Sequence, residues 1–169
     1  MTPLIHPPNR DSRELEQVLV GLLSRRRLTL ALAESCTGGF IANQITNVPG
    51  ASKAFLGGVV AYSNAMKEKF LGVRFKTLLK HGAVSEAVAR EMAEGARKKF
   101  GADFAIAVTG IAGPGGGTKR KPVGTVFIAL AGEEETVVER KLNPFGREKF
   151  KRATANQALK MLCLWLMRA

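Results

Sequence analysis

At 169 residues, of which 46% are apolar, the chain is long enough for one domain with a full-sized hydrophobic core. Its longest apolar runs, residues 103–108 and 123–131, are far below the roughly 18 residues that a membrane helix needs, so we expect no membrane partner. The formal net charge of +12 suits either nucleic-acid binding or a basic surface that attracts a small anionic substrate. Because the lysines and arginines are scattered instead of clustered with aromatic residues, we favour the small anion over nucleic acid as the main partner.

The first residues, 1–11, are rich in proline and lack the charged-then-apolar order of a secretory signal. They predict a loose amino-terminal arm, followed by a single domain over residues 12–169 in a cytoplasmic protein. Cys36 and Cys163 are the two cysteines, and neither a CxxC motif nor a histidine-rich spacing accompanies them. We therefore expect no disulfide framework and no metal site.

Apolar periodicity predicts helices and strands that alternate along the chain. The first expected elements are a helix capped by Ser12 that ends at the arginines 25–27, a strand at 28–33, a helix at 38–46 and a strand at 54–63. A short helix capped by Asn64 and ended by Gly72 follows, then a basic connection at 74–81 and a helix capped by Ser85 that stops near Gly101. The last elements are strands at 103–110, 123–131 and 135–142 and a closing helix at 145–168. This alternation predicts the α/β class, as a three-layer α/β/α sandwich. A short acidic turn at 132–134 joins two strands directly, so the sheet should be mixed and mostly parallel.

The stretch at 28–39, LTLALAESCTGG, changes abruptly from a buried strand to polar side chains. The four residues from Glu34 to Thr37 supply a carboxylate, two hydroxyls and a thiol before helical spacing resumes. A strand that ends in this way places a nucleophile at the carboxyl edge of the sheet, beside unpaired backbone N–H groups. Adjacent residues at a strand end point in opposite directions, so only one of Ser35 and Cys36 should face a substrate, and we predict Ser35.

A glycine-rich loop at residues 110–117 offers closely approachable backbone, together with Thr109, to a phosphate or an oxyanion at the same sheet edge. It matches neither the Walker A motif nor GxGxxG, so a mobile connection without a ligand is the alternative. His6 and His81 are the only histidines, and a Ser-His-Asp triad is possible only through His81. If Ser35 is a nucleophile, its base is then expected to be another type of residue.

Four longer motifs are AESCTGG at 33–39, VPGASKAFLGGVVAYSNAMK at 48–67, HGAVSEAVAREMAEGAR at 81–97 and VTGIAGPGGGTKRKPVGTV at 108–126. Together and in this order they resemble the carboxy-terminal domain of the CinA family, and the resemblance runs from about Leu15 to the last helix. Stand-alone members of that family resemble nicotinamide mononucleotide deamidases. Other members are known as competence-associated proteins whose catalytic competence varies.

The resemblance implies an amidohydrolase that deamidates nicotinamide mononucleotide without a cofactor, through a serine, a tyrosine and a lysine. Carried over to this chain, these residues are Ser35, Tyr62 and Lys67. The residues implied to bind the substrate or its oxyanion are Thr37, Gly38, Gly39, Thr109, Gly110, Ile111, Ala112, Gly113, Arg147 and Arg152. Family members often carry Gly-Asp-Arg where this chain has Phe-Gly-Arg at 145–147, so a role for that acidic residue is not carried over. The implied partner is a small anionic nucleotide, and we also expect a homo-oligomer.

Lys67 fits the implied role on physical grounds as well. If Asn64 caps its helix, Lys67 lies near position N3, where the positive end of the helix dipole disfavours the ammonium form. Partial burial acts in the same direction and lowers the pKa toward a value useful for a general base. Neutral Lys67 could then take the proton of Ser35, with Tyr62 orienting the hydroxyl.

The alternative for Lys67 is a solvated surface cation. For the chain, the alternatives are a non-catalytic binding module of the competence or DNA-damage response and a hydrolase of another amide or phosphorylated ligand.

Overall fold

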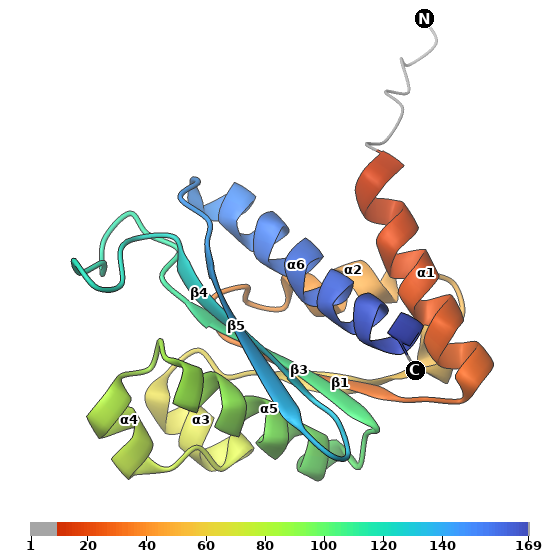
Figure 1. The fold of residues 1–169 in the computed structure, drawn as a ribbon, viewed down its shortest axis with the longest axis horizontal. Coiled ribbons are helices and arrows are strands. Elements are labelled where there is room, and N and C mark those ends of the chain that lie inside the picture. Colours follow the sequence, from red (N-terminus) through yellow and green to blue (C-terminus); the bar gives the residue numbers. More distant parts are fainter. Residues whose placement is uncertain (1–9, 169) are drawn as a thin grey trace, which may run out of the picture.

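The computed structural model describes residues 10–168, and Figure 1 shows them as a central sheet with helices on both sides. The helices are α1 (Arg10–Arg26), α2 (Phe40–Thr46), the 3-10 helix η1 (Ala51–Lys53), α3 (Asn64–Leu71), α4 (Phe75–His81), α5 (Glu86–Phe100) and α6 (Arg147–Arg168). The strands are β1 (Leu30–Glu34), β2 (Phe55–Val60), β3 (Phe104–Gly110), β4 (Thr125–Ala131) and β5 (Thr136–Leu142). Most of the predicted arm, residues 1–9, lies outside the described residues, and the single domain predicted over 12–169 stays a prediction.

The strands form one mixed sheet in the order β2-β1-β3-β4-β5. β1 pairs in parallel with β2 and with β3, whereas β3–β4 and β4–β5 are antiparallel, so β4 alone runs against the other strands. The register places Glu34 beside both Val60 and Val108. The α/β class and the mixed sheet are thereby confirmed, and the carboxyl ends of three parallel strands meet at one edge, where α/β proteins hold their sites.

Helices α1, α2 and α6 cover one face of the sheet and α3, α4 and α5 the other (Figure 1), which confirms the three-layer sandwich. Successive residues of β1 serve the two faces: Leu30 and Leu32 belong to the core beneath α1 and α6, and Ala31 and Ala33 to the core beneath α5. Burial on both faces explains why the central strands are continuous apolar runs. Among the helices of residues 10–168, none combines the length and the apolarity that a membrane crossing requires.

The predicted basic connection at 74–81 is wrong, because most of it forms the helix α4. A carboxylate on α5 compensates its clustered positive charge. Glu91 accepts hydrogen bonds from the Arg74 backbone N–H and from the Thr77 hydroxyl, each at 2.8 Å, and its carboxylate also pairs with the Arg74 guanidinium. The partner lies 17 residues from Arg74, so the local sequence pattern does not reveal it.

Two helices begin at positions other than those predicted. α1 starts at Arg10, so Ser12 lies inside the helix instead of capping it. α3 is capped by Ser63, whose Oγ accepts a hydrogen bond from the Met66 N–H at 3.3 Å, and Asn64 is already the first helical residue. Lys67 therefore lies one position further into the helix than predicted, where the helix dipole acts on it less strongly.

Candidate active site

A cavity of about 280 Å³ opens at the carboxyl edge of the parallel strands. It is lined by residues from the turn after β1, the start of α3, the segment before α5, the loop after β3 and the first turn of α6. These residues are Ser35, Cys36, Tyr62, Asn64, Lys67, Ala83, Val84, Thr109, Gly110, Ile111, Ala112, Gly113, Gly115, Gly116 and Arg147. The structure thus brings the three residues implied as catalytic, Ser35, Tyr62 and Lys67, to one cavity.

Ser35 is held by backbone contacts on both sides. Its N–H donates to the Val108 carbonyl at 3.1 Å, which continues the pairing of β1 with β3 by one residue, and its own carbonyl accepts from the Gly38 N–H at 3.2 Å. Gly38 takes a positive φ of 62° in this turn, a conformation that glycine adopts without strain. The strand-to-helix turn that carries Ser35 is therefore fixed relative to the sheet.

Glu34 is the residue of this turn whose role the sequence analysis missed. Its side chain is 2% exposed and accepts four hydrogen bonds. The donors are the Thr37 hydroxyl at 2.6 Å and the N–H groups of Gly39, Ile41 and Ala42 at 3.0, 3.1 and 2.8 Å. Glu34 thereby satisfies the free amides at the start of α2 and closes the turn around Ser35. An acidic residue shortly before a helix start was the available signal.

Three of the residues expected to bind substrate do not line the cavity. The Thr37 hydroxyl and the Gly39 N–H face Glu34, and neither Thr37, Gly38 nor Gly39 lines the cavity. A Cβ placed on Gly38 would lie 3.8 Å from the Lys151 ammonium nitrogen, so this turn approaches a cation of α6 that the sequence analysis did not single out. The three residues support the turn instead of forming the cavity wall.

Lys67 is buried to the same degree as Glu34, with 2% of its surface exposed. Its Nζ donates to the carbonyl oxygens of Ala61 at 3.0 Å and of Tyr62 at 3.5 Å. Burial lowers the pKa of Lys67, and the neighbouring Cys36 opposes that shift. The predicted direction is thus correct, but burial rather than the helix start is its main cause.

Tyr62 and Arg147 stand at the mouth of the cavity. The Tyr62 side chain is 63% exposed, and its hydroxyl oxygen accepts a hydrogen bond from Nη1 of Arg147 at 3.4 Å. Nη2 of Arg147 donates to the Gly113 carbonyl at 2.6 Å. One guanidinium at the start of α6 therefore joins the loop after β3 to the segment before α3.

The loop after β3 borders the cavity with its backbone. Thr109 is buried and its hydroxyl donates to the Ala83 carbonyl at 2.8 Å, and the Ile111 N–H donates to the Thr125 carbonyl at 2.8 Å. These two groups are occupied by the protein's own contacts. A Cβ at Gly110 would come within 2.9 Å of the Thr125 carbonyl oxygen and the Val126 side chain, so the chain can pass here only as glycine.

Cys36 is also among the residues that line the cavity, and it belongs at the same time to the core beneath α1 and α6. The chemistry of Ser35 and Cys36 nevertheless differs. Burial raises the pKa of Cys36 to about 12; the negative charge of Glu34 adds to this, and Lys67 and Lys151 oppose it. A thiol that stays protonated is a poor nucleophile, so Ser35 remains the better candidate.

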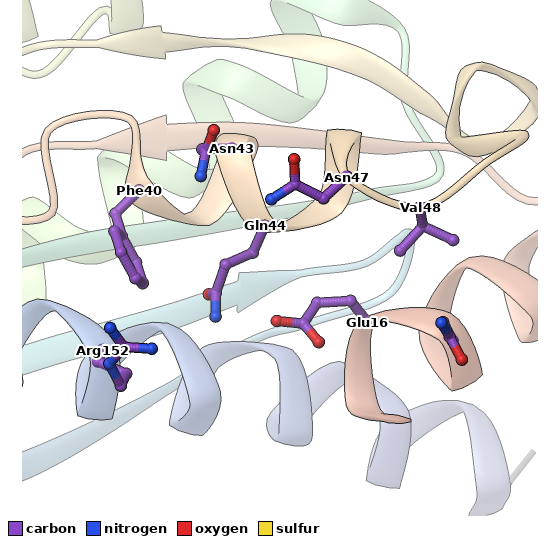
Figure 2. Close-up of a pocket in the computed structure, with 8 residues that line it drawn as sticks. Glu16, Phe40, Asn43, Gln44, Asn47, Val48 and Arg152 are labelled. Carbon is purple, nitrogen blue, oxygen red and sulfur yellow. The ribbon is translucent and has the colours of Figure 1, made fainter. Parts of the chain in front are cut away.

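Arg152 lies outside the Ser35 cavity. Its guanidinium carbon is 5.8 Å from the ring centre of Phe40, a nitrogen of the same group lies 3.6 Å from the Glu148 carboxylate, and the side chain borders a different cavity, drawn in Figure 2. His81 ends α4, and it too is absent from the described lining of the Ser35 cavity. Within residues 10–168 no three His, Cys, Asp or Glu side chains gather as a metal site would require.

Comparison with known proteins places the chain in a family. A family profile described as the CinA C-terminal domain matches residues 12–166. The chain belongs to the CinA family. It is 50% identical over 156 residues to a CinA-like protein of Thermotoga maritima, which covers 92% of this chain and 38% of that protein. This CinA domain therefore spans well under half the length of the Thermotoga relative.

Solved structures of CinA relatives share the whole fold. The competence/damage inducible protein CihA of Agrobacterium tumefaciens superposes with a TM-score of 0.89 at 39% identity, over 98% of this chain and 99% of that one. A CinA superfamily protein of Klebsiella pneumoniae gives a TM-score of 0.91 at 34% identity, over 95% and 100% of the two chains. The resemblance inferred from the four motifs is thus confirmed for family and fold.

Proposed function

We propose that this CinA domain is an amidohydrolase that converts nicotinamide mononucleotide to nicotinic acid mononucleotide and ammonia. The observation that carries the proposal is Lys67, buried in the wall of the same cavity as Ser35 and with a pKa lowered by that burial. A serine hydroxyl needs a nearby base to become a nucleophile, and the described lining of this cavity contains no histidine. A desolvated lysine is the group there that can be neutral and accept the proton.

In the proposed reaction, neutral Lys67 takes the proton of Ser35 as the serine oxygen attacks the carboxamide carbon. The tetrahedral intermediate then collapses: the carbon–nitrogen bond breaks, and the nitrogen takes a proton from the Lys67 ammonium and leaves as ammonia. Water, deprotonated by Lys67, attacks the acyl-serine ester. The second collapse releases the acid and returns the proton to Ser35, so that one water is consumed for each ammonia formed.

Arg147 is the group at the cavity mouth best suited to an anionic substrate. Its present acceptors, the Tyr62 hydroxyl and the Gly113 carbonyl, are both neutral. A phosphate or carboxylate would replace them with charge-assisted hydrogen bonds, which are stronger. In the proposed complex Arg147 binds the nucleotide's anionic group, and Tyr62, released from Arg147, orients the Ser35 hydroxyl.

The direct test is the release of ammonia from nicotinamide mononucleotide by the purified protein in the presence of a metal chelator. We expect ammonia and the acid nucleotide in equal amounts, and no release by a Ser35→Ala control prepared in the same way. Activity that disappears with the chelator and returns with zinc would contradict a mechanism that rests on serine and lysine. We further propose a cytoplasmic location. Cys36 and Cys163 are both free thiols, as is usual in the reducing cytoplasm.

A second candidate is a non-catalytic module of the competence or damage response. It is favoured by the name of the Agrobacterium relative, a competence/damage inducible protein, and by the net charge of +12 of this chain. Contacts to phosphates alone would give duplex DNA binding that is weak and lost in modest salt, which is what we expect of this CinA domain. Tight, salt-resistant binding without turnover of any nucleotide amide would favour the second candidate.

A further inference from the structure

A second cavity, of about 520 Å³, lies between α1, α2 and α6, and it shares no lining residue with the Ser35 cavity. Figure 2 shows Glu16 of α1 and Gln44 of α2 extending into the same space, with Arg152 of α6 near the ring of Phe40. Glu16 and Gln44 are 5% and 9% exposed, so they form a buried floor, whereas Arg152 is exposed at the rim. The volume is within the usual range for small-molecule sites.

Two buried hydrogen-bond acceptors without donors lie at the floor of this cavity. Glu16 Oε2 and Gln44 Oε1 are buried, and neither has a hydrogen-bond partner among the described residues. Leaving such an atom unpaired costs about 1–3 kcal/mol, and more for a charged group. Burial also raises the pKa of Glu16, because the carboxylate has lost its water. These two acceptors thus lack a donor, although the side-chain amides of Gln17, Asn43 and Asn47 also line the cavity.

The rim carries the opposite charge. Arg152 pairs with Glu148 at 3.6 Å, one helical turn away, and both side chains are more than half exposed. Exposed pairs of this kind contribute little, so Arg152 is free to exchange Glu148 for another anion. An acceptor floor and a cationic rim within one cavity select a ligand with a donor at one end and a negative charge at the other.

We propose that the α1–α2–α6 cavity binds a small zwitterion. A primary ammonium group lies between Glu16 Oε2 and Gln44 Oε1, and a carboxylate or phosphate lies against Arg152. The site is distinct from the proposed amidase site and does not depend on its chemistry. An ordered water that merely fills the floor is the competing outcome, and it predicts no preference for a charged amine.

The probes are 4-aminobutyrate and 6-aminohexanoate, with butyrate and butylamine as matched compounds that lack one of the two charges. Amide shifts in a two-dimensional NMR titration at millimolar concentration report both affinity and place. We expect the two amino acids to shift amides of α1, α2 and α6 but not those of residues 109–116. We also expect them to bind at least tenfold more tightly than butyrate or butylamine. Equal binding of butyrate, or no shift in these helices, would overturn the proposal.

Two substitutions test the two ends of the site separately. Glu16→Gln keeps the shape and removes the charge, and should weaken binding about tenfold, because a charge-assisted hydrogen bond is lost. Arg152→Gln should weaken it about threefold, since the contact is exposed. Glu94→Gln on α5 and Lys160→Gln on α6 are exposed controls that should bind as the unchanged chain does. If Glu16→Gln keeps its melting transition and its affinity for 4-aminobutyrate, the floor is not the ammonium site.

Discussion

Glu34 and Glu16 are both buried carboxylates on the same side of the molecule, yet their surroundings differ in one respect. Glu34 accepts four hydrogen bonds, whereas one oxygen of Glu16 has no partner among the described residues. The first carboxylate holds the turn that carries Ser35, and the second borders an open cavity. A buried charge with a complete set of partners therefore indicates a structural support, and one with an incomplete set indicates a site that something else must fill.

The largest expected effect tests whether the turn held by Glu34 carries the nucleophile. Ser35→Ala should lower kcat about 10³-fold or more, because the attacking oxygen is removed. Cys36→Ala should keep most of the activity, since a thiol whose pKa is raised to about 12 takes no part. Ammonia release by the two variants and the unchanged chain is the measurement. The reverse pattern would transfer the role to Cys36.

The second prediction concerns Lys67, whose buried amine donates hydrogen bonds to two carbonyl oxygens. Lys67→Arg keeps the charge but cannot supply a neutral base, so kcat should fall about 10²-fold while nucleotide binding persists. In the unchanged protein, kcat/KM should rise with pH through the lowered pKa of Lys67, because the proposed base is the deprotonated amine. An active Lys67→Arg enzyme with the same rising limb would exclude Lys67 as the base.

A smaller effect is expected from Glu34→Gln, which turns an acceptor of four bonds into a group with one amide oxygen and one NH₂. The new NH₂ would face N–H donors, so the free energy of unfolding should fall by about 2–3 kcal/mol. Chemical denaturation measures that loss. Because Glu34 positions Ser35 without touching substrate, kcat should fall more than KM rises. Unchanged stability would show that the four bonds contribute nothing net.

The smallest effect is expected from Glu16→Gln, which should raise the free energy of unfolding instead of lowering it. Removing an unpaired buried charge should raise the free energy of unfolding by about 1 kcal/mol near neutral pH. Because the folded pKa of Glu16 lies above 4.5, its ionisation costs stability as pH rises through that raised pKa, and the gain should disappear below pH 4.5. Arg152 is the other charged side chain that lines the cavity. A loss of stability in Glu16→Gln at neutral pH would show that the carboxylate is already paired.

Features encoded within one element were predictable from the sequence. The apolar run before Ser35 fixed the strand, and the polar switch after it fixed the position of the turn at the carboxyl edge. Features that depend on a partner far away in the sequence were not predictable from it. Arg74 and Thr77, at the start of α4, pair with Glu91, and nothing within residues 74–81 indicates that carboxylate.

Arg147 and Arg152 show a second limit. They lie five positions apart on α6, which corresponds to a rotation of roughly 140° about the helix axis. The two side chains therefore face different sides of the molecule, one toward the Ser35 cavity and one toward the second cavity. Matching both to a family's basic positions could not distinguish them, whereas the helical period alone would have placed them apart.

Helices α3 and α5 also touch at a position that lines neither cavity. A side chain on Gly95 of α5 would overlap the Leu71 carbonyl oxygen at the end of α3, the helix that carries Lys67. Any substitution there would push α3 away from α5 and move the lysine relative to the serine. In a genetic screen, Gly95 would behave as an essential residue although it contacts no ligand. Inactivating mutations are therefore expected outside the cavity as well, at residues that set the distance between α3 and α5.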